Sequence, residues 1–261
     1  MSKVAIKGAD NGTGIFTIES PATNTNRTLT LPDEAGTVLT SASDLAAAKL
    51  TGTVASAQMP AGLGGLVSMQ VFTANGTWTK PAGVTKVKVT VTGGGGGGSS
   101  TDNDDMAAGG GAGATAIKII DVTNVASVSV TVGAGKAGNT NSQNMAVIYG
   151  NPSSFGSYCT AVGGANCGGN WAIGGYGGTA SGGDININGG DGGGGAIDMT
   201  NPYLAAGTGG SSFWGGGGAG DTRTNFFGRS GRAYGSGGGG GATSQQGESG
   251  ADGIVVVEEY A

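Results

Sequence analysis

The sequence predicts a mainly β protein in two unequal parts. Residues 1–65 combine short strands with a short helix, and residues 66–261 form a strand-framed domain built on packed polyglycine II helices. Three observations lead to this prediction: 60 glycines among 261 residues, valine-rich segments with a period of two, and glycine runs separated by aromatic inserts. Glycine is about three times as frequent as in an average protein.

The N-terminal 65 residues contain two β-type segments and one helical segment. Residues 15–18 and 28–31 are strand-like and are bounded by Asn, Gly and Pro. Residues 41–50 begin with a capping serine, carry an acid in the first turn and end before Gly52. A helix this short is marginal alone, and the region is too small and polar to bury a core. We therefore expect it to associate with copies of itself.

Strand patterns recur through the larger part. They cover residues 71–78 (with a turn at Asn75-Gly76), 86–91, 116–120, 128–132 and 254–260. In residues 86–91 valine alternates with lysine and threonine, the pattern of a half-buried strand. We expect the first and last strands to pair, which would bring Lys86 and Lys88 opposite Glu258 and Glu259.

Glycine tracts lie between these strands, at residues 93–98, 109–113, 192–195, 215–218 and 237–241. Such runs usually indicate flexible linkers. Here the tracts are short, and twelve of the fifteen aromatic residues lie from Tyr149 onward among them. A glycine run can instead adopt the polyproline II conformation, whose outward-pointing backbone groups need partners. Without Cβ atoms neighbouring runs approach closely, so we predict a laterally hydrogen-bonded bundle.

The composition excludes several classes of function. A net charge of −5 and a pI near 4.6 argue against a nucleic-acid partner, which needs a basic face. The absence of histidine removes Ser-His-Asp catalysis and histidine-metal chemistry. No apolar run approaches the ~20 residues of a membrane span, and no secretory signal pattern is visible. We expect no membrane insertion, no cofactor, and assembly in the cytoplasm.

Three patterns match ligand sites without the context that such sites need. Residues 133–138 spell G-x-G-x-x-G, but no amphipathic helix follows. Residues 102–105 are acidic, but they lack the glycine and glutamate of an EF-hand loop, so we expect a solvated loop and no metal site. Cys159 and Cys167 are too few for zinc, and two free thiols are favoured over a disulfide.

Several stretches resemble parts of bacteriophage tail fibres. Residues 71–92 (VFTANGTWTKPAGVTKVKVTVT), which run into six glycines, resemble the opening of the glycine-rich C-terminal domain of these fibres. Residues 250–260 (GADGIVVVEEY) resemble its closing strand, and residues 131–138 and 153–157 resemble its internal motifs. Residues 29–39 (LTLPDEAGTVL) are similar to a segment common in fibre shafts.

The resemblance implies a homotrimeric fibre on the virion. Residues 1–65 would be its shaft, attachment and trimerisation segment, bound to other tail proteins, and residues 66–261 would bind the host. The receptor would be an outer-membrane protein or a polysaccharide on the bacterial surface. In architecture the chain is also similar to the distal adhesins of T-even-type phages, in which loops between polyglycine helices contact the receptor. The expected function is adsorption, without catalysis.

The main candidate for recognition is the insert at residues 221–234. It holds every basic residue after Lys136, together with aromatic residues, and Arg and Tyr dominate binding hot spots. In the alternative, the insert packs on itself and its arginines pair with Asp221 or Glu248. The candidate receptor-binding residues are Arg223, Asn225, Phe226, Phe227, Arg229, Arg232, Tyr234, Trp171, Tyr176, Tyr203 and Tyr149. Trp214 is expected in the core.

Two rival functions belong to other classes. A glycan depolymerase would need two carboxylates held ~5–10 Å apart, and the acids after residue 150 suggest no such pair. An ice-binding or other polyglycine structural protein would need a flat face of evenly spaced Thr or Ala. The inserts here are irregular and bulky.

Overall fold

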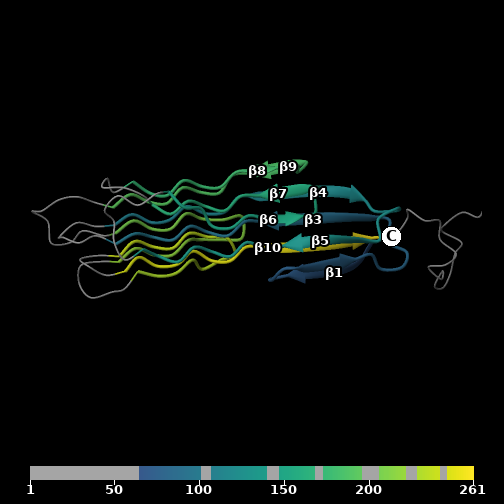
Figure 1. Ribbon diagram of the computed structural model, residues 1–261, viewed down its shortest axis with the longest axis horizontal. Coiled ribbons are helices and arrows are strands. Elements are labelled where there is room, and N and C mark those ends of the chain that lie inside the picture. Colours follow the sequence, from purple (N-terminus) through teal and green to yellow (C-terminus); the bar gives the residue numbers. More distant parts are fainter. Residues whose placement is uncertain are drawn as a thin grey trace, which may run out of the picture. The chain divides into compact units, whose positions relative to one another are not determined.

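The computed structural model describes residues 65–100, 107–139, 147–167, 173–195, 206–221, 228–241 and 246–261, all within one compact unit, Val54–Ala261. This part of the chain is built on two antiparallel β-sheets and contains no helix (Figure 1). The mainly β class is therefore confirmed for it. The strands predicted at residues 15–18 and 28–31 and the helix predicted at 41–50 lie outside the described residues.

The first sheet, called sheet A, has β10 between β1 and the central strand β3. Its strand order is β1 (Leu66–Phe72), β10 (Ile254–Tyr260), β3 (Lys86–Thr92), β4 (Thr115–Asp121) and β9 (Ile185–Ile187). The predicted pairing of the first and last strands is confirmed, because β1 and β3 flank β10 on its two sides.

Only one of the predicted lysine–glutamate pairs forms. Lys88 lies opposite Glu258, and its Nζ is 2.8 Å from Oε2 of that residue. Lys86 lies opposite Tyr260 instead, and Glu259 lies opposite Val87. Successive side chains of a strand point to opposite faces, so Glu259 cannot share a face with either lysine. The prediction for Lys86 and Glu259 was wrong.

The second sheet, called sheet B, is made of shorter strands. Its order is β2 (Gly76–Thr79), β5 (Ser127–Thr131), β6 (Ser153–Phe155), β7 (Cys159–Ala161) and β8 (Ala180–Ser181). The strand predicted over residues 71–78 is divided between the two sheets, since β1 lies in sheet A and β2 lies in sheet B. The turn at Asn75 therefore carries the chain from one sheet to the other.

The apolar core lies between the inner faces of the two sheets. Val87, Val89 and Val91 of β3 are fully buried there, which confirms the period-two prediction for this strand. Opposite them, sheet B contributes Trp78 and Phe155, whose ring centroids are 5.9 Å apart. Burial of apolar surface stabilises a fold by roughly 25 cal/mol per Å², so this sandwich is the main source of side-chain stabilisation.

A buried carboxylate joins three strands at one edge of the core. Glu259 is completely buried and accepts hydrogen bonds from Ser68 Oγ, from Gln70 Nε2 at 2.7 Å and from Trp78 Nε1 at 2.7 Å. A buried carboxylate is unfavourable unless such donors replace its water. Glu259 therefore ties β1 and β2 to β10.

Glycine-rich segments extend from one end of both sheets and lie side by side (Figure 1). Each of the strands β3 to β10 continues directly into one of them. The segments cover residues 93–100, 107–114, 132–139, 147–152, 162–167, 173–179, 188–195, 206–211, 216–221, 228–234, 235–241 and 246–253. Together we call them the bundle.

The bundle is held together by sideways backbone hydrogen bonds with a period of three residues. Successive N–H groups of residues 109–114 donate in turn to segments 188–195, 235–241 and 162–167, at 2.8–3.0 Å, and the order then repeats. The carbonyl groups of the same segment accept from three other segments, 93–100, 173–179 and 206–211. This central segment is therefore surrounded by backbone on all sides.

Close approach of backbones leaves no room for a Cβ atom at many glycines of the bundle. A Cβ atom on Gly96 would lie 2.0 Å from the carbonyl oxygen of Ala165, and a Cβ atom on Gly110 would lie 2.3 Å from that of Gly96. Gly216 differs, since nothing lies within 4 Å of the position that its Cβ would take.

We expect Gly96→Ala to destabilise the protein by about 3 kcal/mol or more, because the contacting atoms are hydrogen-bonded backbone that cannot move aside. Gly216→Ala is the matched control and should change stability by less than about 1 kcal/mol. Denaturant unfolding of the two variants checks this prediction. Equal stabilities of the two variants would contradict the prediction, because they would show that the bundle accommodates a methyl group at position 96.

We expect Glu259→Gln to destabilise the protein by about 2 kcal/mol, because the neutral amide accepts more weakly from Gln70 and Trp78 than a carboxylate does, and its NH₂ group requires the Ser68 hydroxyl to turn from donor to acceptor. The neighbouring change Glu258→Gln alters a partly exposed ion pair and should cost less than about 1 kcal/mol. Thermal and denaturant unfolding measure both effects. A smaller loss for Glu259→Gln than for Glu258→Gln would contradict the role of this carboxylate.

Candidate functional site

The segment ends farthest from the sheets meet at one end of the bundle, which we call the distal end. It consists of Ser99, Ser100, Ala107, Asn139, Cys167, Ala206, Asp221, Gly241 and Gly247 with their neighbours. Each of these residues lies within a few positions of a stretch of chain outside the described residues. The distal end is therefore where the segments are joined to one another.

Backbone hydrogen bonds hold these ends together. The Gly241 N–H donates to the Ser99 carbonyl at 2.9 Å, and the Ala107 N–H donates to the Gly241 carbonyl at 3.3 Å. The Ala206 N–H donates to the carbonyl of Asp221 at 2.8 Å, and the Asp221 N–H donates to the Gly240 carbonyl at 3.0 Å. Five segment ends are thus fixed within one hydrogen-bonded group.

The remaining ends join the same group. The Asn139 N–H donates to the Gly98 carbonyl at 2.9 Å, and the Gly247 N–H donates to the Asn139 carbonyl at 3.0 Å. The Cys167 thiol donates to the Ala108 carbonyl at 3.0 Å. It follows from chain connectivity that six connections begin and end at the distal end: residues 101–106, 140–146, 168–172, 196–205, 222–227 and 242–245.

The distal end buries polar side chains, whereas the sandwich buries apolar ones. Ser100, Asn166 and Asp221 are almost entirely buried there. Ser100 Oγ, Asn139 Nδ2, Asn166 Nδ2 and Asp221 Oδ1 have no hydrogen-bond partner within the part that the structure describes. The polarity of the bundle therefore rises toward the connections.

Six of the candidate receptor-binding residues fall in these connections. Arg223, Asn225, Phe226 and Phe227 belong to residues 222–227, Trp171 to 168–172 and Tyr203 to 196–205, and all six lie outside the described residues. The structure fixes the ends that bracket each connection, and these ends are neighbours. Residues that are far apart in the sequence are thus attached to one surface of the bundle.

The other five candidates occupy three different places. Arg229 is exposed and close to the distal end, where its N–H donates to the Ala219 carbonyl at 2.9 Å. Tyr149 and Tyr176 are exposed on segments that pair with Ala165 on either side, along the flank of the bundle. Arg232 and Tyr234 lie near the turn at Gly235, at the sheet end of the bundle. The structure therefore does not bring Tyr234 to the distal end.

Trp214 is a correction to the sequence analysis. Its side chain is 38% exposed, so the prediction that it belongs to the core was wrong. The residue lies in the turn between Ser212 and Gly215, which are paired with each other, and this turn projects beside sheet A. Its indole N–H donates to Thr92 Oγ1 at 2.9 Å, which holds the ring at the surface.

Across the seven described stretches, the arginines of the insert form no ion pair with Asp221 or Glu248. The two ion pairs in these stretches are Lys88–Glu258 and Lys118–Asp184. Glu248 instead accepts a hydrogen bond from Ser230 Oγ at 2.8 Å. Arg229 and Arg232 therefore do not support the alternative in which the arginines of the insert pair with Asp221 or Glu248.

The part of the chain that the structure describes contains no group of three or more side chains that could hold a metal ion. It also contains no helix that is long and apolar enough to cross a membrane. Cys159 and Cys167 are free and buried. Burial raises the pKa of Cys159 to about 11 and also raises the pKa of Cys167. Both thiols are therefore protonated at neutral pH.

Residues 71–260 match a family of glycine-rich domains. The chain belongs to this family. The match begins inside β1 and ends at the last residue of β10, so it covers the whole bundle, all of sheet B and all of sheet A except the first five residues of β1. No curated protein matches the chain.

We expect both thiols of the glycine-rich domain to resist a disulfide-exchange reagent in the native protein at pH 7. The thiolate is the reactive form, and burial together with the raised pKa keeps its population low. Unfolding in denaturant without reductant should release two reactive thiols per chain. Thiol titration before and after unfolding measures this, and fewer than two thiols would indicate a disulfide.

Proposed function

We propose that this protein is a phage tail-fibre protein that binds a receptor on the bacterial surface through the connections at its distal end. The observation that carries the proposal is that six connections, separated by up to about 140 residues of sequence, begin and end on one surface of the bundle. Binding residues commonly lie on loops that a rigid scaffold positions. An assembly of loops at the tip of a rod suits contact with a cell surface.

The scaffold in this proposal is a set of packed polyglycine II helices. Its support is the three-residue period of lateral hydrogen bonds, since a polyproline II helix has three residues per turn and no internal hydrogen bonds. The close approach of backbones at Gly96 and Gly110 agrees with this, because only glycine allows such contact. A rigid scaffold lowers the entropy lost when its loops bind a receptor.

Arginine and aromatic residues are the proposed contacts. Arg223, Phe226 and Phe227 share the connection at 222–227, and Trp171 and Tyr203 belong to connections that start at the same end. These residue types dominate binding hot spots, and aromatic rings also pack against sugar rings. The receptor is either an outer-membrane protein or a surface polysaccharide. The proposed activity is binding and involves no catalysis.

The proposal includes a homotrimeric fibre that is anchored to the virion through residues 1–65. Several copies acting together raise the avidity of adsorption above the affinity of one site. Weak individual contacts would then be enough for stable attachment, and they would still allow the fibre to release from a cell that lacks the receptor.

The test is the binding of fluorescent full-length protein to a panel of bacterial strains. Replacing residues 222–227 with six Gly and Ser residues should lower binding to a recognised strain by about tenfold or more, through loss of central contacts. The control is Asn124→Ala, an exposed turn residue next to the sheets, which should bind as the wild-type protein does.

Both variants should unfold at the wild-type midpoint, so that a loss of binding reports on contact and not on folding. Binding that survives replacement of each of the six connections in turn would refute the proposal. Comparison of strains with and without surface polysaccharide then separates the two classes of receptor.

A further inference from the structure

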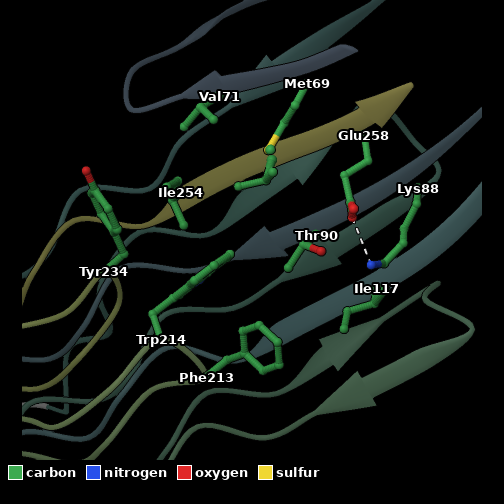
Figure 2. Close-up of a pocket in the computed structure, with 11 residues that line it drawn as sticks. Met69, Val71, Lys88, Thr90, Ile117, Phe213, Trp214, Tyr234, Ile254 and Glu258 are labelled. Atoms are coloured by element: carbon green, nitrogen blue, oxygen red, sulfur yellow. Dashed lines mark ion pairs between the residues drawn. The ribbon is translucent and has the colours of Figure 1, made fainter. Parts of the chain in front are cut away.

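Sheet A has an outer face that is turned away from sheet B and carries apolar side chains. The pairing register sets alternate residues of each strand on that side, among them Leu66, Met69, Val71, Lys88, Thr90, Ile117, Ile119, Ile185, Ile254, Val256 and Glu258. Phe213, Trp214 and Tyr234 stand at its edge and line, with most of these residues, a cavity of about 490 Å³ (Figure 2).

Two turns of the bundle place the aromatic rings beside this face. Trp214 is held by its hydrogen bond to Thr92 at 2.9 Å, and the Phe213 ring meets it edge-on with centroids 5.2 Å apart. Tyr234 precedes Gly235, whose φ of +73° favours glycine and reverses the chain there. Phe213, Trp214 and Tyr234 nevertheless stay 49%, 38% and 44% exposed.

Exposed apolar residues lie on both sides of the outer face. Met69 and Val71 of β1 are 55% and 54% exposed, and Ile119 of β4 is 62% exposed. The Lys88–Glu258 ion pair lies between Met69 and Ile119 across the sheet, and the aromatic rings lie beside the buried Thr90 and Val256. Contiguous apolar patches larger than a few hundred Å² mark interaction surfaces on soluble proteins. The outer face is therefore expected to be covered in the assembled molecule.

A small ligand fits this face less well than a protein surface does. The two charged groups of the cavity, Lys88 and Glu258, already satisfy each other at 2.8 Å. Exposed apolar residues also continue beyond the cavity to Ile119, Ile185 and Leu66. Apolar residues spread over a large surface around a few charged groups are typical of an interface between proteins.

Charge and size indicate a second copy of the chain as the occupant. Charges on this side of sheet A come in opposite pairs, Lys88 with Glu258 and Lys86 opposite Asp121, so the face has no net charge that would repel another copy. The four long strands span about 20 Å by 23 Å from standard strand spacing and rise. A contact of this face with a neighbouring copy would bury roughly 1,000 Å² in total, the size at which specific interfaces begin, and three such contacts can close a ring.

The edge of the face supports the same occupant. β1 is the outermost strand of sheet A, and no strand of the described residues pairs with its other side. It contains no charged residue and no proline, which are the usual protections of an exposed edge. A strand of this kind is suited to a permanent contact.

We propose that the outer face of sheet A, with Phe213, Trp214 and Tyr234, is the surface through which copies of this chain associate. This inference rests on one part of the proposed function, the association of several copies of the chain, and identifies the surface through which they associate. Receptor binding at the distal end is a separate matter.

The test uses full-length chain with the photo-crosslinking residue p-benzoylphenylalanine in place of Ile119, produced together with ¹⁵N-labelled chain. The matched control places the same residue at Ile173, which is 58% exposed and lies off this face, against 62% for Ile119. Irradiation should join position 119 to peptides of the labelled chain from the outer face. Position 173 should give no such light–heavy pairs.

Adding Glu at a second position of the face, Val71→Glu, should lower the yield of light–heavy pairs from position 119 by about tenfold or more. Circular dichroism checks that this variant stays folded. Cross-links from position 119 only within one chain would mean that another part of the same chain covers the face, and they would overturn the proposal. An absence of cross-links would also overturn it. No bacterial cell enters this experiment, so either failure leaves receptor binding untouched.

Discussion

Sideways hydrogen bonding between glycine backbones is the constraint on which the rest of the structure depends. The central segment, residues 107–114, donates to three neighbouring segments and accepts from three more. Buried backbone groups require partners, and here the partners come from other segments because no helix or sheet supplies them. The distance between segments is set by the absence of Cβ atoms, which explains why a domain with so much glycine is ordered.

Glycine loses more conformational entropy on folding than any other residue, so the bundle needs an anchor. The two sheets supply it through the buried valines of β3 and β10 and the rings of Trp78 and Phe155. Each of the strands β3 to β10 runs straight into a bundle segment, so strand pairing also fixes the register of the segments. The apolar sandwich and the backbone bundle are therefore two parts of one folding unit.

The sequence predicted the long strands because valine alternates in them with exposed residues, and it predicted the Lys88–Glu258 pair from their register. It missed β6 to β9, which are too short to show a period. It also missed segments such as 173–179, because side chains like Tyr176 are tolerated wherever they point out of the bundle. The sites of Trp214 and Glu259 depend on contacts between distant residues, which no local pattern records.

The position of β1 has a mechanical consequence. The strand runs toward the bundle, antiparallel to β10, and its first residue pairs with Tyr260 at the end of sheet A farthest from the glycine segments. Tension between Leu66 and the distal tip acts along both strands, so it shears their ladder and loads its hydrogen bonds together instead of opening them one by one. The hydrogen bonds from Ser68 and Gln70 of β1 to the Glu259 carboxylate of β10 share that load. A domain that is pulled from the start of β1 resists being extended lengthwise.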